Sequence, residues 1–383
     1  MIQTYRLRLY PCRQQESLMT ETIETCRRLY NDLLNDRIQN HTGTFEQNRA
    51  LTARRKGNKY LRQVHSQVLQ DVTFRLGKAF GAFFGGLARF PRFKRRGRYN
   101  SFTYPQSGRK GGFKIIDGRL SLSMIGKVRM VLHRDIEGTM KTCTVVRDID
   151  QWYACINVEK EDTKSVPSER PSVGVDLGVT LFAALSDGTI LQAPKLLKKS
   201  ESEIKFLQRS LSRKQKGSKN REKAKVSLGK AWRRLRNRRN DFAHKTSTFF
   251  ASNYGTVVFE DLNIRGMVKN HHLASAILDA CWGKTRRLTA YKAERRAGRV
   301  ILVQPRGTSQ ECSGCGKVVA KALSERTHSC PHCGLELDRD VNAARNILAR
   351  GLEQTPVETG PLPVIRMGKF GQGSKKPTAF KRG

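Results

Sequence analysis

Four cysteines near the C-terminal end constrain the fold more than any other feature of this sequence. Two C-x2-C pairs are separated by 14 residues, and a glycine follows each pair; the cysteines are Cys312, Cys315, Cys330 and Cys333. Such tight turns let four thiolates meet tetrahedrally at one ion, so the spacing predicts one structural zinc site over residues 312–333. The alternative is four buried thiols. His328 and His332 lie close enough in sequence to replace a ligand.

The net charge indicates a polyanionic partner. The 383 residues include 73 lysines and arginines and 33 acids, a formal net charge of +40. Nucleic acid is the polyanion that most readily relieves self-repulsion on this scale. A membrane surface is the alternative, but no apolar run approaches a spanning length, and the first residues lack the apolar segment of a signal peptide. We therefore expect a protein that stays inside the cell and has no membrane partner.

Apolar periodicity predicts a β domain in the N-terminal part of the chain. Residues 1–12 and 97–165 mostly alternate with a period of two, which is typical of strands. A hairpin is expected to pair residues 141–146 with residues 152–158. These strands could close a small barrel or sheet, and a charged linker with two prolines follows over residues 159–171.

A helical insertion is expected within that β domain, over residues 13–96. Apolar residues recur at three- and four-residue steps from 13 to 40 and again from 69 to 83, which predicts two amphipathic helices. Between them, residues 42–58 are polar and basic. We expect a small bundle of two or three helices here.

Two segments are candidates for nucleic-acid contacts. Residues 90–104 interleave aromatic rings with cations, which suits a nucleic-acid groove or, equally, a basic loop whose rings lie in the core. Residues 195–245 carry 19 lysines and arginines against four acids and are expected to form two basic helices joined near Gly217. Such an imbalance favours a nucleic-acid track over a solvated face. The candidate contact residues are Arg92, Lys94, Arg95, Arg213, Lys214, Arg233 and Arg234.

A lone aspartate lies inside a short apolar strand, from Val173 to Val179. Alternation places Asp176 on the same strand face as its flanking glycines, so open space surrounds the carboxylate. A carboxylate removed from water costs several kcal/mol unless a cation compensates it, which suggests a metal site. The alternatives are an aspartate at the wet end of the strand or one bound to a turn. Asp187-Gly188 then predicts a hairpin, so the sheet is antiparallel up to this point.

Further acids follow later apolar segments. A strand over residues 255–259 ends at Glu260 and Asp261, which point to opposite faces, so only one of them can join Asp176. A helix is expected over residues 273–296 and a buried strand over 299–303.

After the cysteines a last helix begins, with Asp338 suited to its N-cap. Asp340 shares a face of that helix with Ala344 and Ile347, so we expect it to project toward Asp176 at the sheet surface. Two strand acids and one helix acid are the parts of a two-metal nuclease site that holds two Mg²⁺ ions.

The ordered motifs resemble those of the transposon-encoded TnpB family, relatives of the compact type V CRISPR effectors, over almost the whole chain. The strongest matches are Gly174-Val175-Asp176-Leu177-Gly178, Glu260-Asp261-Leu262-Asn263, Thr308-Ser309-Gln310 before the cysteines, and Asp338-Arg339-Asp340-Val341-Asn342-Ala343-Ala344. Weaker matches are Arg28-Leu29-Tyr30-Asn31, Phe90-Pro91-Arg92-Phe93-Lys94 and Leu211-Ser212-Arg213-Lys214.

The resemblance implies a multidomain α+β and α/β protein with an RNase H-like (RuvC) mixed sheet over residues 172–311 and 334–350. Residues 312–333 would be its inserted zinc module. The β-barrel-like part would be the family's wedge domain, and residues 13–96 its helical recognition domain. Residues 351–383, rich in glycine, proline and lysine, are expected to be disordered.

The activity implied by the resemblance is RNA-guided cleavage of double-stranded DNA beside a short flanking motif, inside a prokaryotic cell near the nucleoid. Asp176, Glu260 and Asp340 would be catalytic and would bind two Mg²⁺ or Mn²⁺ ions. The guide RNA would derive from the transposon end, and no obligate protein partner is evident. Ser66, Gln67 and Gln70 are candidates for reading the flanking motif, with packing inside the bundle as the alternative.

Other functions compete with this interpretation. A guide-dependent repressor would bind without cutting, but such relatives have lost acids that this chain retains. An unguided metal-dependent nuclease is a second alternative. A transposase would need a His-hydrophobic-His metal pair and a catalytic tyrosine, and His271-His272 lacks that spacing.

Overall fold

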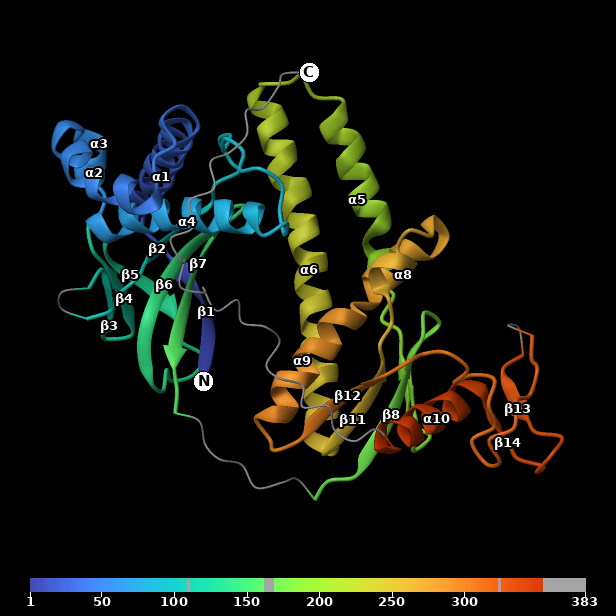
Figure 1. Ribbon diagram of the computed structural model, residues 1–383. Helices are drawn as coiled ribbons and strands as arrows, with labels where there is room; N and C mark the ends of the chain where they lie inside the picture. The colour runs from blue at the N-terminus through green and yellow to red at the C-terminus, as the bar shows by residue number, and fades with distance from the viewer. Residues whose placement is uncertain (109–110, 162–168, 323–324, 354–383) are drawn as a thin grey trace. The chain divides into compact units, whose positions relative to one another are not determined.

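The chain folds into two compact units in a computed structural model (Figure 1). The structure describes residues 1–108, 111–161, 169–322 and 325–353. The first unit comprises Met1–Lys164 and Lys214–Lys230, and the second comprises Ser165–Arg213 and Ala231–Gly383. The predicted linker lies mostly outside the described residues, and so does the predicted tail beyond the end of the last helix.

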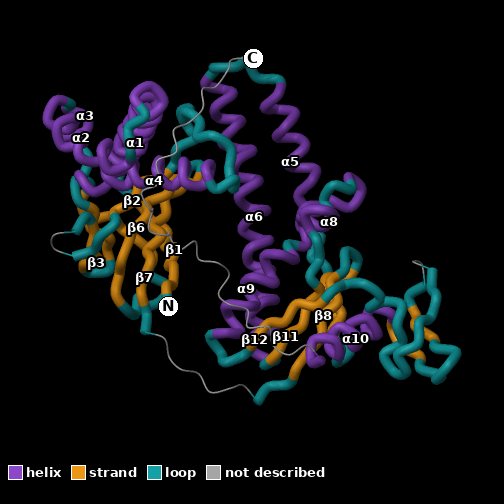
Figure 2. Tube along the Cα trace, in the orientation of Figure 1, coloured by secondary structure: helices purple, strands orange, loops and turns teal. Residues whose placement is uncertain are grey.

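A seven-stranded antiparallel sheet forms the first unit's framework (Figure 2). Its order is β2-β6-β7-β1-β5-β4-β3. The strands are β1 (Ile2–Tyr10), β2 (Ser101–Tyr104), β3 (Phe113–Ile116), β4 (Arg119–Leu122), β5 (Gly126–Val131), β6 (Thr139–Asp148) and β7 (Gln151–Glu159). The predicted hairpin is confirmed, because β6 and β7 pair across a two-residue turn. β1 pairs along nearly its whole length with β7, far away in sequence.

The two ends of this sheet approach each other, which makes it barrel-like. A backbone bridge joins Ser107, after β2, to Phe113 at the start of β3, and the Gly112 amide donates to the Gln106 carbonyl at 3.1 Å. The Tyr104 ring lies against Gly112, where an added Cβ would be only 2.1 Å from the ring. A side chain at position 112 would therefore force these ends apart.

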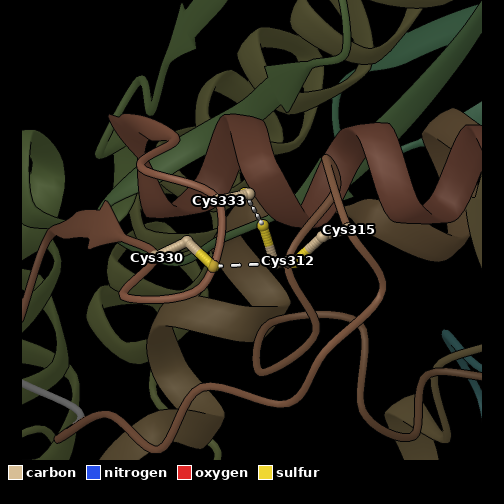
Figure 3. A group of neighbouring side chains, drawn as sticks. All are labelled: Cys312, Cys315, Cys330 and Cys333. Carbon is tan, nitrogen blue, oxygen red and sulfur yellow. Dashed lines mark hydrogen bonds between the residues drawn. The ribbon is translucent and has the colours of Figure 1, made fainter.

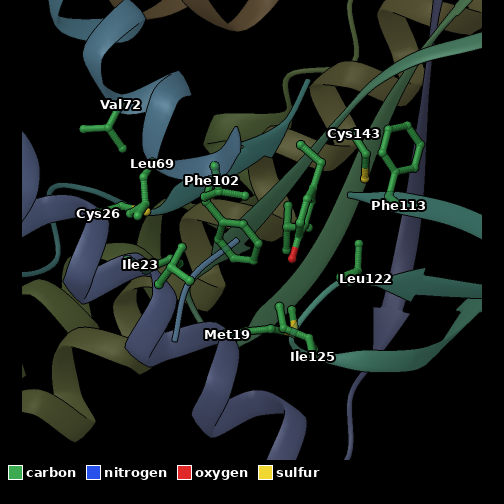
Figure 4. Packing of buried hydrophobic residues seen from close by; sticks show 14 of the residues in the cluster. Met19, Ile23, Cys26, Leu69, Val72, Phe102, Phe113, Leu122, Ile125 and Cys143 are labelled. Carbon is green, nitrogen blue, oxygen red and sulfur yellow. The ribbon is translucent and has the colours of Figure 1, made fainter. Parts of the chain in front are cut away.

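Four helices are inserted after β1: α1 (Arg13–Asn40), α2 (Thr44–Gly57), α3 (Lys59–Arg62) and α4 (Ser66–Phe84). Helix α2 lies in the basic stretch for which the sequence predicted no helix. It buries only Gln47 and Leu51, so its sequence shows no apolar periodicity. α1 and α4 bury Met19, Ile23, Leu69 and other apolar residues against Phe102 of β2 in one continuous core (Figure 4). Burial of these apolar side chains is what holds the insertion on the sheet.

A five-stranded mixed sheet of order β10-β9-β8-β11-β12 forms the second unit's framework. The strands are β8 (Ser172–Leu177), β9 (Leu181–Leu185), β10 (Ile190–Gln192), β11 (Thr256–Glu260) and β12 (Arg299–Val303). The predicted β9–β10 hairpin is confirmed, with Gly188 at φ +91. β8, β11 and β12 run parallel to one another, so the sheet changes from antiparallel to parallel at β8.

In the second unit, helices lie between β10 and β11 and between β11 and β12, and a last helix ends the described chain. They are α5 (Leu196–Ser212), α6 (Lys219–Asn253), α7 (Ile264–Met267), α8 (His271–Ala280), α9 (Trp282–Glu294) and α10 (Arg339–Glu353). α5 and α6 are the two expected basic helices, joined by a turn that contains Gly217 at φ +87, and the N-terminal part of α6 belongs to the first unit. The single helix predicted over residues 273–296 is wrong, because the chain breaks at Cys281, whose φ is +58.

Helix α10 packs directly on β8 and β11. A Cβ added to Gly174 of β8 would lie 2.0 Å from the Ala344 carbonyl oxygen, and one added to Gly351 would lie 2.5 Å from Val258 of β11. Gly174 on the strand and Gly351 on the helix have no side chain, and Ala344 has only a methyl group. The backbone of α10 can therefore lie directly against the sheet. This approach brings the start of α10 to the ends of the two strands.

Candidate active site and cysteine module

The register of β8 and β11 brings two acids side by side. Val258 pairs with Gly174 and Phe259 pairs with Val175, so the next step places Glu260 beside Asp176. Neighbouring strands lie about 4.8 Å apart. By alternation, both carboxylates point to the same face as Gly174 and Val258, which is the face that α10 covers.

The third acid comes from the first turn of α10. Asp340 precedes Ala344 by about 6 Å along the helix, and Asp176 follows Gly174 by about 6.6 Å along the strand. Ala344 rests on Gly174, and the charge of Asp340 raises the pKa of Asp176, so Asp340 lies near Asp176, as the sequence predicts. Asp338 instead accepts hydrogen bonds from the Asp340 and Val341 amides at 2.8 and 3.2 Å, which is the predicted capping role.

The two adjacent acids at the end of β11 have different environments. Glu260 is buried, with 7% of its surface exposed, whereas Asp261 is exposed and forms an ion pair with Arg286 at 2.9 Å. Alternation alone left open which of them joins Asp176. The structure selects Glu260.

Burial and mutual repulsion make this cluster electrostatically unfavourable in the absence of a cation. Burial, followed by the neighbouring charges of Glu260 and Asp340, raises the pKa of Asp176 to about 7. Burial also raises the pKa of Glu260, against the lowering effect of a hydrogen bond from Thr308. Three converging carboxylates, with oxygen donors only, have the chemistry that a hard divalent cation requires.

Two arginines compensate Asp340 in the present arrangement. Arg339 and Arg326 approach its carboxylate oxygens at 3.3 and 3.8 Å. In the part of the chain that the structure describes, only the cysteines form a compact group of potential metal ligands. Because both arginines already contact Asp340, an ion bound at the acids would have to compete with two guanidinium groups for this carboxylate.

Buried hydrogen bonds of Thr308 hold the Glu260 side chain in place. The Thr308 hydroxyl donates to Glu260 Oε1 at 2.6 Å, and Thr308 itself is 3% exposed. Its carbonyl accepts from Asn346 of α10 at 2.9 Å. Sequence reasoning noticed Thr308 only as part of a motif, because nothing local indicates which side chain a buried hydroxyl will meet.

The four cysteines converge as predicted (Figure 3). Their sulfurs all lie within 4.8 Å of one another, and the Cys312–Cys333 and Cys315–Cys330 separations are both 3.6 Å. A tetrahedron with metal–sulfur bonds near 2.3 Å has edges of about 3.8 Å, so the sulfurs are already spaced for one ion. Gly316 and Gly334 both have φ +72, which explains the glycine after each pair.

The cysteine module is attached to α10. It contains the short strands β13 (Thr327–Ser329) and β14 (Glu336–Asp338). Asn342 donates to the Glu311 carbonyl at 2.7 Å and accepts from the Ser313 amide at 2.9 Å. His328 is buried beside Lys321, and the cysteines complete the ligand set without either histidine.

The candidate nucleic-acid contacts differ in accessibility. Ser66, Gln70, Arg92, Arg95, Arg213 and Lys214 are exposed, and Lys94 is half-buried. Gln67 donates to Gln106 at 2.8 Å. Arg234 is half exposed and forms an ion pair with Glu203, whereas Arg233 is buried at 8% exposure; their contacts with nucleic acid stay predictions. Among the described helices, none is long and apolar enough to cross a membrane.

The rings predicted to interleave with cations also separate in the structure. Tyr99, Phe102 and Tyr104 are buried in the core of the first unit, whereas Phe90 and Phe93 are exposed. The core interpretation is therefore confirmed for Tyr99, Phe102 and Tyr104, and the groove interpretation stays a prediction for Phe90 and Phe93.

Three family models match the chain. One described as "Probable transposase" matches residues 155–271, one described as "Cas12f1-like, TNB domain" matches residues 282–347, and one described as "Helix-turn-helix domain" matches residues 1–44. In the structure, residues 1–44 form β1 and α1 and end where α2 begins.

Curated relatives match over nearly their whole length. The chain is 33% identical to "Putative RNA-guided DNA endonuclease InsQ" of Escherichia coli (strain K12), over 91% of this chain and 92% of the relative. It is 34% identical to a "Putative RNA-guided DNA endonuclease" of Streptomyces pristinaespiralis, over 97% and 95%. Among solved structures, Cas12f1 in an sgRNA–target DNA complex shares the fold, with TM-score 0.55, 13% identity, and coverage of 91% and 98%.

Proposed function

We propose a function for this chain from one premise: it belongs to the TnpB family of RNA-guided DNA endonucleases. The chain is a transposon-encoded RNA-guided DNA endonuclease that cleaves double-stranded DNA beside a short flanking motif. Its partners are a guide RNA from the transposon end and the target DNA. The observation that carries the proposal is the convergence of Asp176, Glu260 and Asp340 on one face of the mixed sheet, where burial raises the pKa of Asp176 to about 7.

In this proposal the three acids hold two Mg²⁺ or Mn²⁺ ions. When bound, these ions supply an activated water and stabilise the leaving oxygen of the phosphodiester. Glu260 is held by Thr308, and Asp340 leaves its arginine partners to complete the ligand set. Cys312, Cys315, Cys330 and Cys333 hold one structural Zn²⁺, which is the ion that tetrahedral four-thiolate sites most often bind.

The remaining parts take the roles that the family suggests. Residues 172–311 and 334–350 form the nuclease domain, with residues 312–333 as its zinc module. Residues 1–12 and 97–165 form a wedge-like domain, and residues 13–96 recognise the guide RNA and the flanking motif. The exposed cations at 92, 95, 213 and 214 contact phosphates. A cytoplasmic, nucleoid-associated location and action without an obligate protein partner belong to the same proposal.

Purification of the protein from cells that carry its native flanking DNA tests this function. We expect a single co-purified RNA species of defined length that ends in sequence from beyond the transposon boundary. With that RNA, the protein should cut DNA matching the guide only when Mg²⁺ or Mn²⁺ is present. Heterogeneous RNA with guide-independent cutting would indicate an unguided nuclease, and a defined RNA with stable binding but no cutting would indicate a repressor.

A further inference from the structure

An exposed apolar surface lies where α4 ends. We call it the aromatic platform and define it as Phe83, Phe84, Leu87, Phe90 and Phe93. Four of these side chains are well exposed: Phe84 at 78%, Leu87 at 72%, Phe93 at 52% and Phe90 at 45%. Scattered exposed apolar residues are ordinary on a protein surface, but several within about ten consecutive positions mark an interaction site.

The platform is preorganised. Phe80 is buried in the core and contacts the Phe84 and Phe90 rings, with centroids at 6.0 and 5.5 Å. Phe83 in turn contacts Phe84 and Phe90, both at 5.3 Å between centroids. The rings therefore support one another from a fixed anchor, and little side-chain freedom is left to lose on binding.

The segment after the platform is held to α1. The Lys94 amide donates to Asn31 at 2.7 Å, and the Lys94 carbonyl accepts from Arg27 at 2.8 Å. These bonds explain why Asn31 and Lys94 both lie in motifs of the sequence although they are far apart in it. They also fix the direction in which the basic segment runs past the rings.

The stretch of chain that carries the platform has charges of one sign. Residues 72–116 contain no aspartate or glutamate, and five arginines between positions 89 and 98 are exposed: Arg89, Arg92, Arg95, Arg96 and Arg98. A protein partner would have to bring a dense acidic surface to so basic a site. A nucleic-acid strand brings phosphates for the arginines and bases for the rings at the same time.

We propose that the aromatic platform binds unpaired nucleotides of the guide RNA by stacking bases on Phe84 and Phe90, while the neighbouring arginines neutralise their phosphates. This proposal rests on the proposed function, because it assumes a guide RNA. The ligand must be unpaired nucleotides, because bases within a duplex already stack on each other and cannot present a face to a ring.

Leucine and tyrosine substitutions separate stacking from simple apolar contact. In Phe84→Leu the apolar surface is kept and the aromatic face is lost, whereas Phe84→Tyr keeps the face. We expect Phe84→Leu and Phe90→Leu each to weaken binding of the co-purified RNA about tenfold, because stacking on one ring contributes that order of affinity. Phe84→Tyr should bind like the wild type.

Phe45→Leu is the matched control, because Phe45 of α2 is 75% exposed in the same unit but lies outside the platform. It should leave RNA affinity unchanged. All of these positions are on the surface, so thermal unfolding should also be unchanged, which would exclude misfolding as the cause of weaker binding.

Ultraviolet crosslinking supplies the second measurement. Peptides containing Phe84 or Phe90 should crosslink to nucleotides that chemical probing shows to be unpaired in the free RNA. Phe84→Leu with wild-type affinity and no such crosslink would overturn the proposal. Loss of affinity in Phe84→Ala but not in Phe84→Leu would also overturn it and would indicate an apolar partner, such as a second copy of this chain.

The failure of this proposal can be distinguished from the failure of the proposed function. If no defined RNA co-purifies with the wild-type protein, the proposed function fails and the platform has no guide to bind. If a defined RNA binds tightly and directs cleavage while the leucine variants behave like the wild type, only the platform proposal fails.

Discussion

The two sheets of this protein use their faces differently. In the antiparallel sheet of the first unit, β7 alternates strictly between buried residues, such as Trp152 and Ile156, and more accessible ones. In the mixed sheet of the second unit, β11 is buried at every position, from Thr256 to Glu260. Parallel strands covered on both faces leave no wet side for a charged residue.

That difference determines what a charge does in each unit. Cations of the first unit can remain in water at the ends of strands and helices, where their solvation costs little. Glu260 is buried and Asp176 is only partly exposed, so their charges are compensated mainly by a ligand or by neighbouring groups. Within the proposed function, this difference assigns binding to the first unit and metal chemistry to the second.

The sharpest test of the comparison uses the two adjacent acids that end β11. Glu260→Gln should reduce guided cleavage by about a thousandfold or more, since loss of a ligand from a two-metal site removes several kcal/mol of transition-state stabilisation. Asp261→Asn should leave cleavage within about twofold, because an exposed ion pair such as that with Arg286 contributes little. Cleavage rates at saturating guide RNA and Mg²⁺ measure both.

Guide and target binding should be unchanged in either variant. Equal losses of cleavage in Glu260→Gln and Asp261→Asn would contradict the assignment of Glu260 to the site. A loss of RNA binding in Glu260→Gln would contradict the division of labour between the two units.

Removal of one cysteine should have the next largest effect. Cys312→Ser should lower the free energy of unfolding of the second unit by about 3 kcal/mol or more, because a four-thiolate ion stabilises the fold that gathers its ligands. The matched control is Cys281→Ser, since Cys281 lies outside the cluster. Metal content and thermal unfolding measure the effect, and a Cys312→Ser protein with full metal content and stability would refute it.

The pH dependence of stability should reveal the buried acid. Because the pKa of Asp176 is raised to about 7 in the folded protein, this residue favours folding at low pH, and the contribution is lost as pH rises from about 4 to about 7. A rise in pKa from about 4 to about 7 corresponds to about 4 kcal/mol, and the partial exposure of Asp176 reduces the expected loss without Mg²⁺ to about 2 kcal/mol.

Comparison with Asp176→Asn isolates this effect, because other titrating groups are common to both proteins. In Mg²⁺-free buffer the two should be about equally stable near pH 4, and the asparagine variant should be the more stable one above pH 7. Denaturant unfolding across this range measures the difference. A difference that did not change with pH would show that Asp176 ionises normally.

The smallest effect should come from the residue that positions Glu260. Thr308→Val is nearly isosteric and removes the hydroxyl that donates to Glu260 at 2.6 Å. We expect cleavage to fall about tenfold, in keeping with the loss of one hydrogen bond to a charged group. The variant should also need more Mg²⁺ for half-maximal cleavage, with nucleic-acid binding unchanged.

Thr308→Ser keeps the donor and should restore most of the activity. If serine and valine reduced cleavage equally, the role of Thr308 would be packing rather than positioning. Thermal unfolding of both variants should remain close to that of the wild type.

Local sequence patterns predicted much of the site. The β6–β7 and β9–β10 hairpins, the cysteine cluster and the Asp338 cap are all confirmed, because each depends on residues close together in sequence. The break at Cys281 and the helix α2 were not predicted. Each is stabilised by packing that leaves little or no apolar period.

Surface exposure was predicted less well than secondary structure. Arg233 was expected to meet nucleic acid and is buried, whereas Phe84, which the apolar periodicity did not single out, is 78% exposed. Whether a side chain reaches water depends on which elements pack over it, and those elements come from distant parts of the chain.

The sequence by itself determined the clustering of the four cysteines, the strand that carries Asp176 and the opposite directions of Glu260 and Asp261, because turns and strand alternation are local. Only the tertiary structure placed Glu260 rather than Asp261 beside Asp176, which strand alternation left open, and showed that Thr308 holds Glu260. These outcomes depend on the parallel register of β8 with β11 and on the seating of Ala344 over Gly174. Both are long-range packing events, and a short stretch of sequence does not encode the position of the surface it will meet.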